Sequence, residues 1–492
     1  MNKRFSSAKF KYGSVALTFT IVFVIFVILF NAIFSVVANK KGGFYVDLTG
    51  EQIYSLSEPT LDAISGLQKN VEIIFCMTED KLDDSTEMSY IKRLAEKYVS
   101  ASDKISVSYV DCVKNPTFFN QFKKSSTDTI SMTSVIINCA ENKRYVVYKA
   151  ENFFKFTSET PTRIFAYDGE NKFTSAIMQA ALNTMQKAAF IKGHGELHSD
   201  AFSALLVEQG YEVSDINLKE TSAEELAQYN LLIICNPLYD YTGISDMQEN
   251  RVNEISMLND YLNKNFGNLM VFIDYETPGL KEFSAFLADD WGVSHSEGGL
   301  IVESADSAVS SLVATFIGTP DSTGEYATKI HASVTKSGAQ ATLFGYATPL
   351  NIEFSEKANK KVDAVYRTSK KAQLYKDGEI VSASSAPVMT LSTYTKVYNN
   401  SKKQANVLVC GSIDFLNHIS NNAYANADIL KSAFALMGNV NVVTGIDYKV
   451  IEDTTITVSQ KAFRANVIRL SVIIPLIIAA IGIFVYIKRK KA

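Results

Sequence analysis

Long apolar segments near both ends of the chain constrain its fold most. Residues 14–38 carry no charged side chain, and residues 467–487 carry only Arg469. A bilayer core about 30 Å thick requires roughly 20 apolar residues in a helix, which both segments supply. Pro475 lies inside the second segment, and proline is tolerated in membrane helices. The sequence therefore predicts transmembrane helices over 14–38 and 467–487.

Basic residues flank these segments on their terminal sides. Residues 1–13 hold four basic and no acidic side chains, and residues 488–492 hold four more basic ones. By the positive-inside rule, we expect a two-pass plasma membrane protein with both termini in the cytoplasm and residues 39–466 extracytoplasmic. A cleaved signal peptide is the alternative for the first segment, but its apolar run exceeds the about 7–15 residues of such a signal.

The middle of the chain is acidic. Residues 39–466 hold all 52 acidic residues and 39 of the 48 basic ones, so their net charge is −13. This charge argues against binding to nucleic acid. A hydrophobic content of 47% excludes a disordered chain.

The cysteines are odd in number and form no CxxC pair. Each ends or follows an apolar, strand-like run, so we expect buried free thiols rather than a disulfide framework. They are Cys76, Cys112, Cys139, Cys235 and Cys410.

The order of predicted elements indicates an α/β protein. A strand at 71–77, a helix at 88–102, a strand at 105–111 and a hairpin over 134–150 favour a thioredoxin-like layer. A redox enzyme of this class would need CxxC, which the sequence lacks.

Strands and helices also alternate over residues 169–440, which predicts a larger parallel sheet with helices on both faces, of degenerate amidotransferase or Rossmann-like type. A β-rich insertion is expected near 303–404. The predicted domain boundaries are a basic tail 1–13, a helix 14–38, domains 39–168 and 169–440, a linker 441–466, a helix 467–487 and a basic tail 488–492.

Several motifs, in order along nearly the whole chain, resemble one family. They are Asp47–Thr49 with Tyr54–Ser57, DCVKNP (111–116), GENKFTSAI (169–177), KGHGE (192–196), LLIICNP (231–237), VFID (271–274) and GSIDFLNH (411–418). Together they resemble the auxiliary membrane subunit of ABC-type transport systems, the gliding-motility auxiliary component family.

The resemblance implies a non-catalytic auxiliary subunit of an ABC-2-type transport system. Its partners would be a permease and a cytoplasmic ATP-binding subunit, and its large domain would face the permease or its substrate, a small molecule or polysaccharide. The sequence has no GxxxxGK[ST] loop, so this chain does not supply the phosphate-binding site for ATP hydrolysis.

The predicted ligand-binding residues lie at expected strand ends. Ligands bind open parallel sheets at the carboxyl ends of the strands, where Gly193, His194, Gly195, Glu196 and Asp274 are expected. The alternative for the glycines is a tight turn that needs them for backbone reasons. His194, Glu196 and His198 do not form HExxH, so we expect no metal and no cofactor.

Catalytic residues are not expected. An amidotransferase needs a cysteine nucleophile on a tight turn with a histidine nearby, and neither Cys235 nor Cys410 has this setting. We therefore predict that the chain is not an enzyme. Two alternatives stay open: a membrane-anchored extracytoplasmic ligand-binding or sensor protein, and an amidohydrolase-like enzyme that uses Cys235, Cys410 or His194.

Overall fold

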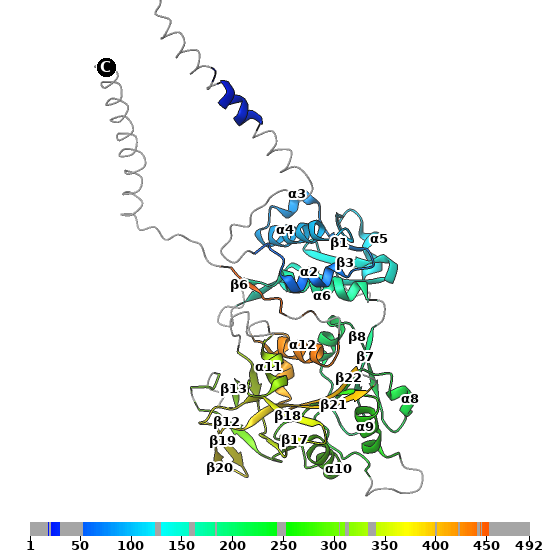
Figure 1. Cartoon of the computed structure of the whole chain (residues 1–492), viewed down its shortest axis with the longest axis vertical. Coiled ribbons are helices and arrows are strands. Elements are labelled where there is room, and N and C mark those ends of the chain that lie inside the picture. Colours follow the sequence, from blue (N-terminus) through cyan, green and yellow to red (C-terminus); the bar gives the residue numbers. More distant parts are fainter. Residues whose placement is uncertain are drawn as a thin grey trace, which may run out of the picture. The chain divides into compact units, whose positions relative to one another are not determined.

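The computed structural model describes most of the chain between residues 53 and 451 (Figure 1). The described residues are 18, 21–29, 53–123, 129–156, 163–182, 185–243, 252–304, 306–309, 314–332, 341–398, 401–421, 424–439, 443 and 445–451. The chain divides into two compact units, 1–450 and 451–492, and every element below belongs to the first.

The prediction of two membrane spans is corrected by the structure. Of the first segment, the described helix covers residues 21–29. Among the described residues, no helix is long and apolar enough to cross a membrane. The two-pass plasma membrane assignment, with its extracytoplasmic 39–466, is therefore wrong by this test.

Several predicted segments lie beyond what the structure describes. The second apolar segment, 467–487, is outside the described residues, as are the tails 1–13 and 488–492. Only part of the predicted linker, up to residue 451, is described.

A four-stranded sheet forms the N-terminal part. Its order is β2-β1-β3-β4, with β1 and β2 parallel and the other neighbours antiparallel. The strands match the predicted ranges. They are β1 (Val71–Phe75), β2 (Ile105–Tyr109), β3 (Ser134–Cys139) and β4 (Arg144–Lys149).

The crossover helix α4 (Thr86–Ala101) buries one side against this sheet. Its N-cap, Ser85, accepts a hydrogen bond from the Met88 amide at 3.3 Å, which satisfies one of the free amides of the first turn. The apolar residues that recur at helical spacing along it are all buried: Ile91, Leu94, Ala95 and Tyr98. The other helices of this part are α2 (Glu58–Ser65), α3 (Glu79–Leu82), α5 (Pro116–Phe119) and α6 (Gly169–Ala181).

A nine-stranded mixed sheet forms the larger part. The order along it is β14-β18-β21-β22-β10-β9-β7-β8, and β17 pairs with β18. Two of these strands are short, β14 (Thr319–Pro320) and β17 (Glu356–Lys357). The strands from β8 to β22 are parallel, while β21 and β18 are antiparallel to their neighbours. The parallel strands are β7 (Gln186–Ile191), β8 (Tyr211–Ile216) at the edge, β9 (Leu231–Cys235), β10 (Asn268–Phe272) and β22 (Ser401–Cys410). The fold is thus mixed α/β, with parallel and antiparallel sheets.

Helices cover both faces of this sheet, as predicted (Figure 1). One core joins the sheet to α7 (Asp200–Glu208), α11 (Glu325–Ala332) and α12 (Asn426–Leu436). The opposite core joins it to α8 (Ala223–Leu226), α9 (Glu254–Asn263) and α10 (Lys281–Ala285). Strands β9 and β10 are therefore buried on both faces along their whole length, which explains their continuous apolar sequences.

The region expected to hold a β-rich insertion carries several strands, and two of them extend the large sheet. Strands β18 (Lys360–Arg367) and β21 (Pro387–Tyr398) lie within it and extend the sheet past β22. Val362, Ala364 and Tyr366 of β18 are buried, so this segment belongs to the main core. Shorter strands make small separate sheets: β11 (Val293–His295) with β16 (Leu350–Ile352), β12 (Leu300–Val302) with β19 (Gln373–Lys376) and β20 (Glu379–Ala383), and β13 (Thr315–Ile317) with β15 (Leu343–Gly345).

A small sheet brings the two ends of the described body together. Its order is β23-β6-β5, from β5 (Phe154–Phe156), β6 (Ile164–Tyr167) and β23 (Lys449–Val450). Lys449 of β23 lies 3.1 Å from Glu170, an ion pair, and donates a hydrogen bond to the carbonyl of Ser55. Residues almost 400 positions apart are thus held in one contact set, which we call the terminal clasp (Ser55, Glu170 and Lys449).

Charged side chains also join α6, α7 and α12. Lys172 lies 2.8 Å from Glu208, and Lys155 lies 3.9 Å from Asp168 and 3.7 Å from Asp428. Burial raises the pKa of the Glu208 and Asp428 carboxyls, but nearby lysines outweigh it and hold both at about 2. These side chains, called the junction cluster below, are Lys155, Asp168, Lys172, Glu208 and Asp428.

Candidate functional site

The Gly193–Glu196 loop follows β7 at the carboxyl edge of the parallel strands, as predicted. Gly193 and Gly195 have φ angles of +122° and +79°, which side-chain-bearing residues rarely adopt. A Cβ on Gly195 would also lie 3.0 Å from the Leu238 side chain. Both glycines are therefore needed for the backbone conformation of this tight turn.

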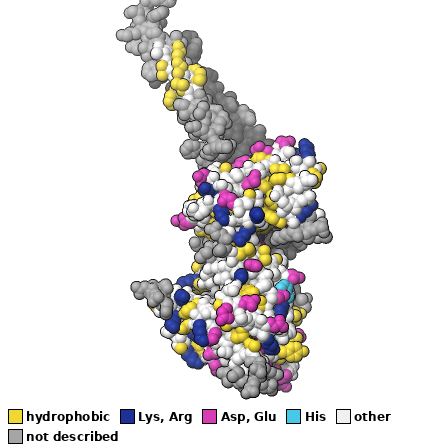
Figure 2. All heavy atoms as spheres, turned by 90° about the vertical axis from the view of Figure 1, so that its right-hand side faces the viewer, with side chains coloured by type: hydrophobic (Ala, Val, Ile, Leu, Met, Phe, Trp, Pro, Cys, Tyr) yellow, Lys and Arg dark blue, Asp and Glu magenta, His cyan; other side chains and the backbone are white. Residues whose placement is uncertain are grey.

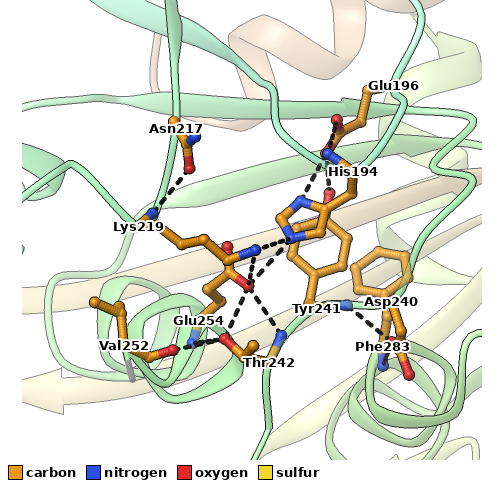
Figure 3. Close-up of polar contacts among 10 residues, drawn as sticks. All are labelled: His194, Glu196, Asn217, Lys219, Asp240, Tyr241, Thr242, Val252, Glu254 and Phe283. Carbon is orange, nitrogen blue, oxygen red and sulfur yellow. Dashed lines mark hydrogen bonds and ion pairs between the residues drawn. The ribbon is translucent and has the colours of Figure 1, made fainter. Parts of the chain in front are cut away.

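This turn directs His194 into the protein (Figure 3). The residue is 1% exposed, and its ring stacks on Tyr241 with centroids 4.0 Å apart. Nδ1 lies 3.3 Å from Oε1 of Glu196, and Nε2 lies 3.1 Å from Oε2 of Glu254. Both ring nitrogens are thus held by buried carboxylates.

Glu196 is fixed by the same loop. Its Oε2 accepts the backbone N–H of His194 at 2.7 Å, and its Oε1 accepts the hydroxyl of Tyr241 at 2.7 Å. Its side chain is only 1% exposed. His194 and Glu196, two of the four predicted loop residues, therefore point into the protein and contact each other.

Glu254 completes the site, and no sequence motif pointed to it. It opens α9 after the N-cap Asn253, and its Oε2 accepts from the backbone N–H and the hydroxyl of Thr242 at 2.9 and 2.8 Å. Its side chain is fully buried, and Oε1 has no hydrogen-bond partner within the described residues. A glutamate in the first turn of a helix is common, so the sequence carried no signal that it meets His194.

The charges of this cluster balance. Burial lowers the pKa of His194, but hydrogen bonds to Glu196 and Glu254 outweigh it and raise the pKa to about 9. Burial raises the pKa of both glutamates, but their bonds to His194 and its neighbours leave both pKa values lowered. Lys219 Nζ lies 3.7 Å from Glu254. Two cations and two carboxylates therefore face one another, and we call them the His194 cluster.

Proton transfer by this cluster is disfavoured by its own bonds. At neutral pH the imidazolium of His194 donates to two carboxylates and has no lone pair with which to accept a proton. Lys219, whose side chain is 46% exposed, is the one member of the cluster that solvent reaches broadly. The arrangement stabilises the loop more readily than it performs acid–base catalysis.

Asp274, the remaining predicted site residue, lies in a separate network after β10. Its Oδ1 accepts the Glu276 amide at 2.9 Å, and its backbone amide donates to Thr277, whose hydroxyl donates to Asn236 at 2.5 Å. Burial raises the pKa of Asp274. Among the described residues, no hydrogen bond or ion pair joins it to His194, so the structure does not bring the predicted residues into one polar site.

The cysteines considered as nucleophiles are buried and free. Cys235 and Cys410 both lie opposite Phe272, on the two neighbours of β10. Burial raises the pKa of Cys235 to about 12 and that of Cys410 further still. A thiol in this state is almost entirely protonated at neutral pH, whereas the thiolate is the nucleophile.

Metal-ligand geometry does not occur in the part of the chain that the structure describes: no three His, Cys, Asp or Glu side chains there could hold an ion. His198, the third residue of the HxExH pattern, pairs with Asp215 at 3.4 Å instead of joining His194.

Apolar side chains lie exposed beside the His194 cluster. Leu197, Leu238 and Tyr239 are 49%, 49% and 68% exposed. The amides of Leu238 and Tyr239 both donate to the carbonyl of His194, so the two loops are held together. On the face drawn in Figure 2, hydrophobic side chains lie exposed among side chains of both charges.

Comparison with known families gives a match over the N-terminal part. Residues 50–153 match a family described as a domain of unknown function, DUF7088. No curated protein matches the chain.

Solved structures resemble the chain weakly, each over 52% of its length. The mmIFT52 N-terminal domain is 16% identical, with a TM-score of 0.35 and 97% of that chain covered. PurLQS from Thermotoga maritima is 10% identical (TM-score 0.28, fully covered). A glutamine amidotransferase from Thermotoga maritima is 8% identical (TM-score 0.27, 99% covered). Scores this low carry no functional argument.

Proposed function

We propose that the chain is a non-catalytic accessory subunit that acts by binding other proteins. The observation that carries this proposal is the occupation of both ring nitrogens of His194 by Glu196 and Glu254 at 3.3 and 3.1 Å. Acid–base or nucleophilic chemistry at this loop would require a side chain that is free to accept a proton. His194 is not free to do so, because both of its ring nitrogens are bonded to carboxylates. The raised pKa of Cys235 supports the same conclusion.

The partners we propose are an ABC-2-type permease and its cytoplasmic ATP-binding subunit. The ordered motifs from Asp47 to His418 support this assignment, and so does the lack of a phosphate-binding loop in the sequence. In this proposal the N-terminal sheet is a thioredoxin-like layer without redox chemistry. The larger sheet is an amidotransferase-like domain without a nucleophile.

A ligand-binding or sensor role is the weaker candidate. It would use the loop at Gly193–Glu196, but His194 and Glu196 are almost fully buried and already bonded. A ligand would have to break two ion pairs in a site that solvent reaches mainly through Lys219. The exposed Leu197, Leu238 and Tyr239 favour a protein partner over a small polar ligand.

Co-purification tests the proposal. The tagged full-length chain, expressed at its native level and extracted in mild detergent, is expected to bring down a multi-span permease and an ATP-binding subunit in fixed ratio. Recovery of neither would overturn the assignment.

Paired variants make this test specific. Tyr239→Ser with Leu238→Ser is expected to weaken co-purification. The control is Val113→Ser, which removes one apolar side chain that is 70% exposed on another loop. Equal loss in both variants would assign the effect to the fold and not to this surface.

A further inference from the structure

Strand β4 is an edge of the N-terminal sheet. Within the described residues its single strand neighbour is β3. The amide of Ala150 donates to the Thr133 carbonyl at 3.0 Å. This bond shows which residues of β4 direct their backbone groups towards β3. Because such residues alternate in an antiparallel ladder, Tyr145 and Val147 direct their backbone N–H and C=O groups away from β3.

A cavity of about 520 Å³ runs along this edge. Five consecutive residues, Tyr145–Lys149, line it. Successive side chains of a strand point to opposite faces, so a cavity over one face would touch only alternate residues. Contact with all five places the cavity beside the strand, where its outward backbone groups form the floor. We call it the β4 groove.

The two walls of the β4 groove differ in character. On one side Tyr145 and Val147 pack with Phe122 and Ile130, and the rings of Phe122 and Tyr145 lie 5.3 Å apart. This wall is apolar and aromatic, and it suits hydrophobic side chains.

The opposite wall carries polar groups. Gln179 of α6 donates from Nε2 to the carbonyl of Val207 at 2.6 Å. Its Oε1 is buried and has no hydrogen-bond partner within the described residues. This oxygen is closed to solvent in the structure, so a donor in the groove would reach it only once Gln179 turned towards the groove.

Charge is distributed at the ends of the groove. Lys143 and Lys149, one at each end of β4, are both exposed, and the side chain of Lys149 is 57% exposed. The acidic neighbour of Lys149 is Glu151, at 3.9 Å. Glu208 also lines the groove, but its carboxylate is paired with Lys172 at 2.8 Å. Among the described residues, Lys149 has only the long surface pair with Glu151 and can face a second carboxylate.

We propose that the β4 groove binds an extended, acidic segment of a partner protein as an added strand. Its backbone would pair with Tyr145 and Val147, apolar side chains would pack on Phe122 and Ile130, and a polar side chain would donate to Gln179. An acidic residue would face Lys149. A cavity of this volume is typical of ligand sites. The inference rests on the proposed role in protein binding, but not on which partner is bound.

Panning a random dodecapeptide phage library on the purified full-length chain tests the proposal. Enriched peptides are expected to alternate apolar and polar residues and to include an acidic one. Val147→Pro removes the outward amide, a change that edge strands tolerate, and is expected to weaken peptide binding at least tenfold. Val147→Ala keeps that amide and is expected to lose only a few-fold.

Two further measurements test peptide binding even if Val147→Pro fails to fold. Bound peptide is expected to slow hydrogen exchange at the amides of Tyr145 and Val147. Gln179→Leu is expected to change which side chain the peptides prefer opposite it. Absence of enrichment, equal binding to Val147→Pro, or unchanged exchange overturns the proposal.

Self-association would identify a different occupant of the groove. If the chain dimerises with increasing concentration and Val147→Pro abolishes this in sedimentation, the occupant is a second copy, and the proposal of a partner segment fails. Failure to recover a permease and an ATP-binding subunit would overturn the proposed partners but leave peptide binding to the groove intact.

Discussion

Nε2 of His194 lies 3.1 Å from Oε2 of Glu254, a residue 60 positions further along the chain. This contact ties the turn after β7 to the first turn of α9. Because Glu196 holds the other ring nitrogen, the imidazolium is a charged link between the turn after β7 and helix α9. Its consequences for stability can be measured directly.

The stability of the protein is expected to fall as pH rises from about 6.5 to 9. The pKa of His194 is raised to about 9 in the folded state, so its contribution is fully present below the unfolded value near 6.5 and is lost above 9. The shift corresponds to at most about 3 kcal/mol. Above pH 9, Lys219, whose Nζ is 3.3 Å from Nε2, can donate to the neutral ring and reduce the loss.

Urea unfolding at several pH values checks this dependence. The same series on His194→Gln should be flatter between pH 6.5 and 9. A slope that is identical in the two proteins would contradict the assignment of this titration to His194.

Removing the charge of Glu254 is expected to destabilise the fold strongly. Glu254→Gln leaves the imidazolium with one carboxylate in a buried site, and breaking a buried pair costs about 3–5 kcal/mol. Asp260→Asn on the same helix is the control, because Asp260 pairs with Lys264 at the surface. That change should cost under about 0.5 kcal/mol. Chemical denaturation of both variants would compare them, and equal effects would refute the importance of burial.

Thiol labelling is expected to be selective for Cys112. This residue is partly exposed, whereas the other four cysteines are buried. Burial raises the pKa of Cys76 and Cys235 to about 12, which keeps them protonated as well as shielded. Iodoacetamide at pH 8 followed by peptide mass spectrometry should find one modified site. If Cys235 in the folded protein were modified as much as Cys112, the prediction would be wrong.

The junction cluster is expected to make the protein sensitive to acid. The pKa values of Glu208 and Asp428 are held at about 2, so their stabilising contribution is present above the unfolded values near 4 and is lost as pH falls towards 2. Asp428→Asn should lower stability at pH 7 and reduce the loss between pH 4 and 2. Thermal unfolding at both pH values would measure this, and parallel curves for the two proteins would count against it.

Alanine at Gly195 is expected to cost more than alanine at Gly66. Gly195 has a φ of +79° and its new Cβ would meet Leu238 at 3.0 Å, so strain of about 1–3 kcal/mol is expected. At Gly66 φ is −83° and the nearest atom to the new Cβ is 3.8 Å away. Gly66→Ala should therefore be neutral or slightly stabilising. Similar melting temperatures for the two variants would show that the turn after β7 can rearrange.

The elements whose signal is local were predictable from sequence. The spacing of Ile91, Leu94, Ala95 and Tyr98 identifies the buried side of α4, and all four are buried. The continuous apolar run before Cys235 identifies a strand that is covered on both faces. The spacing of apolar residues along the sequence reflects which positions are buried, so elements of this kind can be recognised without the structure.

Features that depend on distant partners were not predictable. Nothing local marks Glu254 as the partner of His194, and the loop was expected to present His194 to a ligand instead of burying it. The position of β18 and β21 in the large sheet was not predictable either, because it depends on hydrogen bonding between β22 and β10, which are far apart in the sequence. The membrane assignment rested on the length and composition of two apolar segments and on their flanking basic residues, whereas among the described residues no helix is long and apolar enough to cross a membrane.

The terminal clasp has a mechanical consequence. Because Lys449 contacts Glu170 and Ser55, a pulling force applied through residues 55 and 449 would load this clasp and the short β23–β6 pairing first. The long strand pairs of the nine-stranded sheet, such as β21 with β22, lie outside that line of force. We therefore expect the contacts of the terminal clasp to break under force before the rest of the fold unfolds.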